Sequence, residues 1–309
     1  MNTDMNTARA AAQLLVNSLV ASTSVRVGRP EKTVDKLSSL IAAGKSDIKV
    51  ISDFDHTLSR YHLNNEHCPY SDEIFIGQTI APKVSERLLE VCKKYEYAEF
   101  HADMTPEQKS PIMQKWWEES QNTILTGGFS LPQIKHLVKT SNVRLRDSVV
   151  DLLDLLSINN IPLMIFSAGI TNVIEIVLQQ NISDMKLLDN VMIAANEMLF
   201  DHSEKVVKFS RPIIHTFNKA AKILSNEQKA KVIEKMGTRQ HWILLGDSQA
   251  DPEMLDGLDI DQSKILKIGF LNKHFDKLLP QYNDCYDMVL IDDQTMTVPI
   301  KILKLIVNS

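Results

Sequence analysis

The chain has 309 residues, of which 44% are hydrophobic and 24% charged, and its net charge is −5. That length is about twice a typical domain of ~150 residues, so we expect one large or two modest domains with a substantial core, not a disordered tail. The 34 basic and 39 acidic residues are intermixed, which argues against an extended face for binding a nucleic acid polymer, and no apolar run approaches the ~20 residues that span a membrane.

Hydrophobic periodicity predicts the first elements in chain order. An amphipathic helix is expected over 10–21, and a second helix over 31–43. A buried strand over 48–53 follows. From 58 to 142 the pattern is helical, punctuated by prolines, with no convincing series of strands. We therefore predict a helical insertion, or cap, over 58–142.

After the insertion, strands and helices alternate. The expected elements are helices at 146–156 and 171–180, and strands at 161–166, 191–194, 242–245, 265–268 and 288–291. Such alternation predicts an α/β fold with a doubly wound, mostly parallel sheet covered on both faces, built from 1–57 and 143–309. Ligands of such sheets bind at the carboxyl ends of the strands, so the polar residues at those ends are the candidate site.

Several familiar motifs are missing. The sequence contains neither GxGxxG nor HExxH. The triplet at 44–46 ends like a phosphate-binding loop, but the first glycine of that motif is absent and the strand follows instead of preceding it. The three cysteines cannot all pair and show no CxxC spacing, which argues against a disulfide scaffold or structural zinc and favours a reducing compartment, the cytoplasm.

Two carboxylates, Asp53 and Asp55, end the first predicted strand. Aspartate is common in turns, so two acids at this spacing are weak evidence by themselves. In such a pair, one carboxylate can act as a nucleophile while the other protonates the leaving group. Because two like charges in one cleft repel each other, we expect a cation beside them, and Mg²⁺ prefers oxygen ligands of this kind.

Other polar residues follow later strands. Asp247 and Asp251 come after the strand at 242–245, where a capped helix would also explain them. Ser167 follows the strand at 161–166 and is expected to open a helix. Its hydroxyl and the following N–H groups, beginning with Ala168, would then form an anion site. Lys219 is singled out only by its position between Ser167 and Asp247.

The order Asp53-x-Asp55-x-Thr57, Ser167, Lys219, Asp247-x-x-x-Asp251 resembles the motifs of the haloacid dehalogenase superfamily of phosphohydrolases. The insertion then looks like the cap that some members carry between their first and second motifs. The resemblance implies a core of that superfamily's fold.

A closer resemblance is to the cytosolic 5′-nucleotidases of type III, the pyrimidine 5′-nucleotidase family. It rests on the segments 51–60, 165–170, 217–219, 244–249 and 265–272, and it extends from about Val25 to the C-terminus. Two positions depart from the family pattern: His56 stands where methionine is usual, and Ala250 where glycine is usual. Neither departure removes a catalytic group.

The resemblance implies a role for each motif residue. Asp53 would attack phosphorus to form an aspartyl-phosphate, and Asp55 would protonate the nucleoside oxygen and then activate water. Magnesium would be held by Asp53, the backbone carbonyl of Asp55, and Asp247. Ser167, Ala168 and Lys219 would bind the phosphate. Thr57 and Asp251 would support the site, Asp251 by orienting Lys219 or a metal-bound water.

Selection of the base would fall to the cap. Glu99 matches a carboxylate that receives hydrogen bonds from the base, and Ser120 matches a polar position beside it. Adjacent residues of a helix point about 100° apart, so only one of Trp116 and Trp117 can face the cleft, the other packing in the core. Trp117 resembles the branch that accepts 7-methylguanosine monophosphate, whereas Ser120 resembles the pyrimidine branch, so the base stays open.

The sequence thus predicts a magnesium-dependent nucleoside 5′-monophosphate phosphohydrolase, acting as a monomer on a small substrate and with no membrane or nucleic acid partner. One alternative is a phosphatase of the same superfamily that acts on a sugar or amino-acid phosphate. A second is a catalytically silent nucleotide-binding protein.

Overall fold

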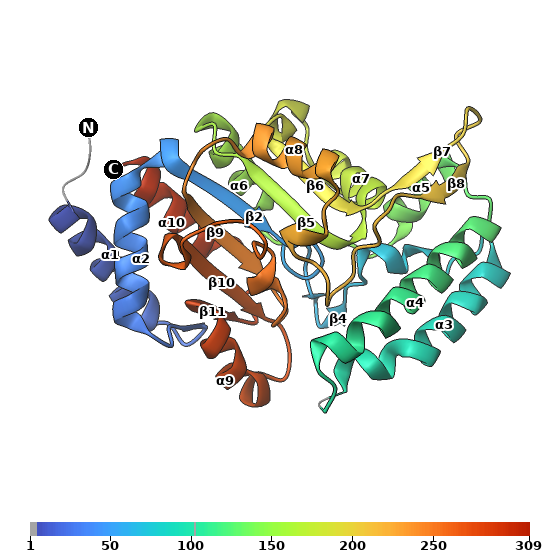
Figure 1. Ribbon diagram of the computed structural model, residues 1–309, viewed down its shortest axis with the longest axis horizontal. Coiled ribbons are helices and arrows are strands. Elements are labelled where there is room, and N and C mark those ends of the chain that lie inside the picture. The colour runs from blue at the N-terminus through green and yellow to red at the C-terminus, as the bar shows by residue number, and fades with distance from the viewer. Residues whose placement is uncertain (1–4, 102) are drawn as a thin grey trace.

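The computed structural model describes residues 5–101 and 103–309 of the chain. Within them a central sheet of seven strands lies between layers of helices (Figure 1). The strands, in their order across the sheet, are β1 (Val25–Arg26), β11 (Met288–Ile291), β10 (Ile265–Leu271), β9 (His241–Gly246), β2 (Ile48–Ser52), β5 (Leu163–Ile170) and β6 (Val191–Asn196). Among these, only β1 at the edge runs antiparallel to its neighbour, β11.

The strands are apolar because both faces of the sheet are covered. Every residue of β2 and β9 is buried, and alternate side chains of β9 enter two separate apolar clusters. Ile243 and Leu245 pack in one cluster, whereas Trp242 and Leu244 pack in the other. Alternation of side chains along a strand places these two clusters on opposite faces. The predicted α/β fold with a mostly parallel sheet is therefore confirmed.

Two sets of helices cover the faces. The first face meets α2 (Pro30–Ala43), α6 (Val149–Ile158), α7 (Thr171–Asn181) and α10 (Thr297–Val307), with α1 (Met5–Val20) packed on α2; the second meets α8 (Asn226–Met236) and α9 (Phe275–Cys285). Among the described residues, no helix combines the length and the hydropathy needed to cross a membrane.

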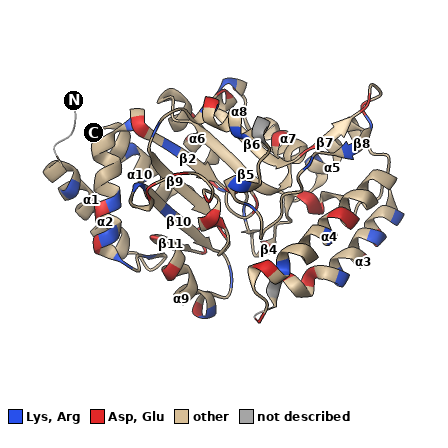
Figure 2. Ribbon diagram, in the orientation of Figure 1, with Lys and Arg blue, Asp and Glu red and all other residues tan. Residues whose placement is uncertain are grey.

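Two long antiparallel helices form a separate layer at one end of the molecule. They are α3 (Pro82–Phe100) and α4 (Pro106–Thr126), and they pack side by side at the right of Figure 1. The shorter α5 (Leu131–Thr140) packs on α7 of the core instead. Within the expected insertion, it is therefore the pair α3–α4 that stands apart from the sheet. On the face that Figure 2 shows, both acidic and basic residues lie along this pair.

The elements differ from the expected ones in several places. The strand β5 continues four residues past Phe166, and α6 begins at Val149 instead of Arg146. Two small hairpins have no counterpart in the prediction: β3 (His62–Leu63) with β4 (Glu66–His67), and β7 (Met198–Phe200) with β8 (Val206–Phe209). All four of these strands are short, so an alternating pattern had little length in which to develop.

Candidate active site

The sheet order explains why the acidic motifs meet. The strand β2 lies between β9 and β5, and all three run parallel. Their carboxyl ends therefore open on one edge, where Asp53 follows β2 and Asp247 follows β9. Ser167 lies in the last part of β5. Residues separated by more than a hundred positions thus line one small space.

A buried lysine joins two of the aspartates. The Nζ atom of Lys219 lies 2.6 Å from Oδ1 of Asp53 and 2.5 Å from Oδ1 of Asp251. Their exposed fractions are 7% for Lys219, 4% for Asp53 and 0% for Asp251. Burial alone would lower the pKa of Lys219, but Asp251 and Asp53 together raise it, so the ammonium stays charged. Lys219 thus forms direct ion pairs with both Asp53 and Asp251.

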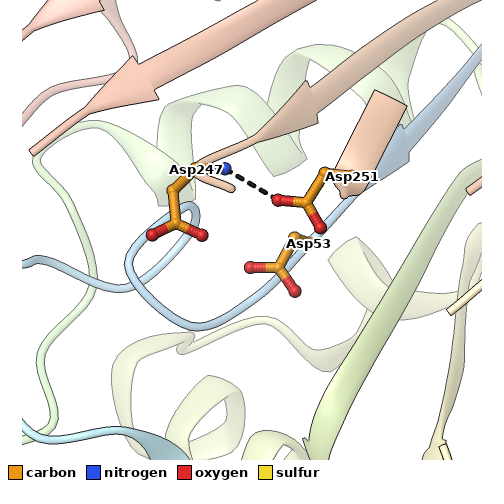
Figure 3. Close-up of side chains that lie close together, drawn as sticks. All are labelled: Asp53, Asp247 and Asp251. Carbon is orange, nitrogen blue, oxygen red and sulfur yellow. Dashed lines mark hydrogen bonds between the residues drawn. The ribbon is translucent and has the colours of Figure 1, made fainter. Parts of the chain in front are cut away.

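Three carboxylates form a cluster that fits a hard cation. Asp53, Asp247 and Asp251 each present an oxygen within 4.8 Å of the others (Figure 3). Burial raises the pKa of Asp53 to about 6, and burial followed by the charge of Asp53 raises the pKa of Asp247 well above its ordinary value. Ionised carboxylates this close need a positive charge in addition to Lys219. The donors are all oxygen, which suits magnesium.

Asp251 itself supports the cluster instead of completing it. Its Oδ2 accepts hydrogen bonds of 2.9 Å from the backbone N–H groups of Asp247 and Ser248, and its Oδ1 pairs with Lys219. With both oxygens engaged, Asp251 fixes the loop after β9 and orients Lys219. Gly246 makes this approach possible, because a Cβ atom there would lie 2.4 Å from Cβ of Asp251.

Asp55 faces a different partner from Asp53. Its Oδ1 accepts a bond of 2.7 Å from the backbone N–H of Ser71, and its Oδ2 accepts one of 2.7 Å from the hydroxyl of the same residue. Burial and then the charge of Asp53 raise the pKa of Asp55 well above its ordinary value. A carboxyl group with a raised pKa can carry a proton near neutral pH, as a general acid must.

The surroundings of Ser167 differ from the prediction. Instead of opening a helix, Ser167 lies in an irregular extension of β5, and α7 begins four residues later at Thr171. The strand continues because its pairing with β6 resumes at Ile170 after a shift of register. The Ser167 hydroxyl accepts a bond of 3.0 Å from the N–H of Gly169. Ala168 lies between them and is partly exposed, and the segment expected to start a helix is instead an irregular part of strand β5.

A buried arginine fixes the loop after β2 through hydrogen bonds. The sequence predicts that this residue begins a helix. Arg146 donates to the backbone carbonyls of His56, Thr57 and Asp293, and to Oδ1 of Asn272. Burial lowers its pKa to about 10, so it remains charged at neutral pH. Thr57 is completely buried, and its hydroxyl finds no hydrogen-bonding partner among the described residues.

Two asparagines shape the segment that carries Lys219. Asn196, at the end of β6, donates to the carbonyls of Ala168 and Ile214 and accepts from the N–H of Ile214. Asn218 accepts from the N–H of His215. These contacts tie the Lys219 loop to the end of β5. Sequence reasoning missed them because a single asparagine carries no periodic signal.

The cap residue Glu99 reaches this same loop. Its Oε1 accepts a bond of 3.2 Å from the hydroxyl of Thr216, three residues before Lys219. Burial raises the pKa of Glu99, while the bond from Thr216 opposes that rise. Burial, and then the charges of Asp247, Glu99 and Asp55, raise the pKa of the Tyr70 hydroxyl.

The two tryptophans of α4 point in different directions. Trp116 stacks on Tyr95 of α3, with ring centroids 6.4 Å apart. Trp117 shares a helix face with Ser110, seven residues earlier, and Gln121, four residues later. Ser110 contacts His215 at 3.5 Å, and Gln121 accepts a bond from Arg211. That face of α4 therefore meets the loop leading to Lys219. Ser120 is half-buried.

His56 is buried among rings next to the aspartates. Its Nε2 lies 2.9 Å from the carbonyl oxygen of Cys68, and its ring contacts those of Tyr61, His67 and Tyr70. Burial lowers its pKa to about 3, so the ring is neutral and adds no charge to the site.

Comparison with known proteins decides the family. Residues 56–307 match the profile of the pyrimidine 5′-nucleotidase (UMPH-1) family. The chain belongs to this family. A 7-methylguanosine phosphate-specific 5′-nucleotidase of Gallus gallus is 36% identical over 94% of this chain and 99% of its own length. A putative cytosolic 5′-nucleotidase 3 of Caenorhabditis elegans is 34% identical over 96% of this chain and 79% of its own length. The resemblance seen in the sequence is thus confirmed.

A solved structure agrees with the pyrimidine 5′-nucleotidase assignment. Cytosolic 5′-nucleotidase IIIB bound to cytidine superposes with a TM-score of 0.83 and 28% identity, covering 94% of this chain and 97% of the other. A probable phosphoserine phosphatase of Vibrio cholerae shares the fold at a TM-score of 0.53 and 13% identity, covering 96% and 84%. That second likeness concerns the fold alone.

Proposed function

We propose that this protein is a magnesium-dependent 5′-nucleotidase that converts nucleoside 5′-monophosphates to nucleoside and phosphate through an aspartyl-phosphate. One observation carries the proposal: Asp53, buried at the end of β2, is paired with Lys219 and clustered with Asp247. Phosphoryl transfer needs alignment and neutralisation of charge, and these residues supply both.

The first step would use the two aspartates in different roles. A carboxylate oxygen of Asp53 attacks phosphorus, and the bond from phosphorus to O5′ of the nucleoside breaks. Asp55 gives its proton to O5′ as that oxygen leaves. Lys219, already in contact with Asp53, would bind a phosphate oxygen together with Ser167 and the N–H of Ala168.

The second step would reverse the role of Asp55. Its carboxylate takes a proton from water, the water oxygen attacks phosphorus, and the bond between phosphorus and Asp53 breaks to release phosphate. Asp53, Asp247 and the carbonyl of Asp55 would hold the magnesium ion, which supplies positive charge that neutralises the phosphate oxygens when bound. Thr57 and Asp251 would keep these groups in place.

The helix pair α3–α4 would select the base. This pair is a smaller unit than the whole insertion over 58–142. Glu99 would accept hydrogen bonds from the base, with Ser120 beside it, and Trp117 would offer a stacking face. The relatives are named for pyrimidine and for 7-methylguanosine nucleotides, and the proposal covers both. Because the described Asp53, Lys219, Asp247 and Asp251 belong to one chain, a monomer would hold a complete site.

A cytoplasmic location is also proposed. The three cysteines, Cys68, Cys92 and Cys285, are free in the structure, which suits a reducing compartment. The relative in Caenorhabditis elegans is named as cytosolic.

A substrate panel tests the proposal. Phosphate release should be measured with magnesium on cytidine, uridine, adenosine, guanosine and 7-methylguanosine monophosphates, with serine phosphate and a sugar phosphate alongside. We expect the monophosphate of cytidine, uridine or 7-methylguanosine to be the best substrate. Faster turnover of serine or sugar phosphate would favour the other phosphatase reading, and no release from any ester would favour a silent binding protein.

A further inference from the structure

Ser71 holds both oxygens of one catalytic carboxyl group. Its N–H donates to Oδ1 of Asp55 at 2.7 Å, and its hydroxyl donates to Oδ2 at 2.7 Å. A carboxyl group held at both oxygens by one residue cannot rotate about its terminal bond without losing at least one hydrogen bond. The contact therefore fixes the plane of the Asp55 carboxyl group.

The position of Ser71 is itself well determined. It is completely buried and begins the short 3₁₀ helix η2 (Ser71–Phe75). Ile74 and Phe75 of that turn are buried in the main apolar cluster, and the Phe75 ring packs against Phe129 at 5.0 Å. Ser71 thus stands on an anchored turn that comes shortly before α3 in the chain.

Strand β5 leaves room for the contact between Ser71 and Asp55 at one residue, Gly169. A Cβ atom at Gly169 would lie 2.1 Å from Oγ of Ser71 and 2.8 Å from Oδ2 of Asp55. The strand end of β5 thus packs directly over the pair, and only a residue without a side chain fits there. Gly169 also donates its N–H to Ser167, which connects the pair to the expected phosphate site.

We propose that Ser71 is a positioning residue for the proton transfer to the leaving group, because it aims the Asp55 carboxyl group through its N–H and its hydroxyl. A hydroxyl both donates and accepts, so the contact with Oδ2 can persist when Asp55 passes its proton to the substrate. This inference rests on the proposed phosphohydrolase function and adds a residue to it. Sequence motifs gave no indication of Ser71, which lies sixteen residues after its partner.

The leaving group provides the test. Nucleoside oxygen is a poor leaving group and needs a proton, whereas p-nitrophenolate leaves with little assistance. Rapid-quench measurement of the first turnover isolates that step from the later hydrolysis of the aspartyl-phosphate. We expect Ser71→Ala to slow nucleoside release about 10–100-fold, because a misaligned catalytic group costs that much. Release of p-nitrophenol should slow by less than about threefold.

Three variants complete the experiment. Ser71→Thr keeps the hydroxyl and should recover most of the rate, whereas Ser71→Cys, which offers only a weak donor, should resemble Ser71→Ala. Ser85→Ala is the matched control: this buried serine of α3 accepts a bond of 2.7 Å from the N–H of Gly77, in the same part of the chain. The Ser85→Ala variant should release both nucleoside and p-nitrophenol at the wild-type rate. Thermal melts establish that each variant is folded.

Two results would overturn the proposal: an equal loss with both leaving groups in a folded Ser71→Ala or Ser71→Cys protein, or no loss with either. Failure of the nucleotidase function has a different signature, since the wild-type protein would then release no nucleoside while still hydrolysing p-nitrophenyl phosphate. In that case phenyl phosphate, with its poorer leaving group, replaces the nucleotide and the comparison stands.

Discussion

Thr216 and Glu99 join the loop that carries Lys219 to helix α3. The Thr216 hydroxyl donates to Oε1 of Glu99 at 3.2 Å, and Lys219 follows three residues later. The same loop meets the cap at two more places, where His215 contacts Ser110 and where Nζ of Lys109 lies 5.1 Å from the ring centre of Phe217. The short segment that carries Lys219, expected to bind phosphate, therefore also contacts Glu99, expected to bind the base.

Thr216→Val should weaken the use of nucleotides without harming the chemistry. The change removes one hydrogen bond and keeps the shape, so we expect a loss of about 1 kcal/mol, or about fivefold in kcat/KM, on nucleoside monophosphates. Hydrolysis of p-nitrophenyl phosphate should be unchanged, and Thr216→Ser should restore the loss. Equal losses on both substrates would show that the bond serves the loop and not Glu99.

Trp117→Ala should damage the use of 7-methylguanosine monophosphate more than hydrolysis of a small ester. Stacking of a base on an aromatic ring contributes roughly 1–3 kcal/mol, and a cationic base gains most from an indole face. Trp116→Ala is the control: since Trp116 stacks on Tyr95, its loss should lower the melting temperature instead. A large stability loss in Trp117→Ala with no change in specificity would assign Trp117 to packing.

Asp53→Asn should abolish turnover while leaving the protein folded. An amide cannot attack phosphorus, and we expect activity to fall by more than about a thousandfold. The raised pKa of Asp53 means that its charge costs stability above the ordinary carboxyl pKa, so the variant should melt no lower than the metal-free wild type at pH 7. Activity near the wild-type level would exclude Asp53 as the nucleophile.

Magnesium should stabilise the protein more at pH 7.5 than at pH 5.5. Asp53 has a raised pKa of about 6, so it takes up a proton as the pH falls through that value, and a protonated carboxyl group binds metal poorly. Melting curves with and without magnesium, after dialysis against a chelator, measure the difference. An identical shift at both pH values, or none, would contradict the assigned ligands. Calcium, which prefers more ligands at longer distances, should bind but inhibit turnover.

His215 should make the fold sensitive to acid. Burial lowers its pKa to about 4 from an ordinary 6.5, so between these values the unfolded chain binds the proton that the folded protein refuses. Its stabilising effect is therefore complete above pH 6.5 and is lost as the pH falls. At pH 5 the ordinary pKa lies 1.5 units above the pH, which at ~1.36 kcal/mol per unit is about 2 kcal/mol.

Urea titrations of His215→Gln and the wild type at pH 7.5 and 5 check this. The free energy of unfolding of the variant, relative to that of the wild type, should be about 2 kcal/mol more favourable to the variant at pH 5 than at pH 7.5. The exposed His136→Gln serves as the control and should show no such change. A pH-independent difference would mean that His215 takes up its proton at the same pH in the folded and the unfolded chain.

The strands that carry the aspartates could be predicted because they are long and buried on both faces. Strand β2 continues directly into Asp53, and β9 ends at Gly246, just before Asp247. The order of the strands across the sheet then brings the motifs together. By contrast, Arg146 was assigned to a helix, because its carbonyl partners come from segments distant in the sequence and leave no local pattern. Ser71 escaped prediction for the same reason.

The Ser167 region shows a second limit of local patterns. The pattern predicted a turn into a helix at Ser167, but the backbone stays extended through Gly169 to Ile170, which pairs with Asn196 of β6. The glycine is required by the close approach of Ser71 and Asp55, not by the turn. Local propensity describes which backbone conformations a residue allows. Here the packing of three segments that are distant in the sequence determines which conformation is adopted.

The paired lysine also sets the valence that the site can accept. Asp251 and Lys219 neutralise each other, which leaves the charges of Asp53 and Asp247 uncompensated when all four groups are ionised. Two negative charges are balanced by one divalent ion. A monovalent ion would leave one negative charge uncompensated in this group of residues, and a trivalent ion would leave one positive charge in excess. Electroneutrality, fixed by a single buried ammonium group, thus favours a divalent ion for the proposed metal, independently of its size or coordination geometry.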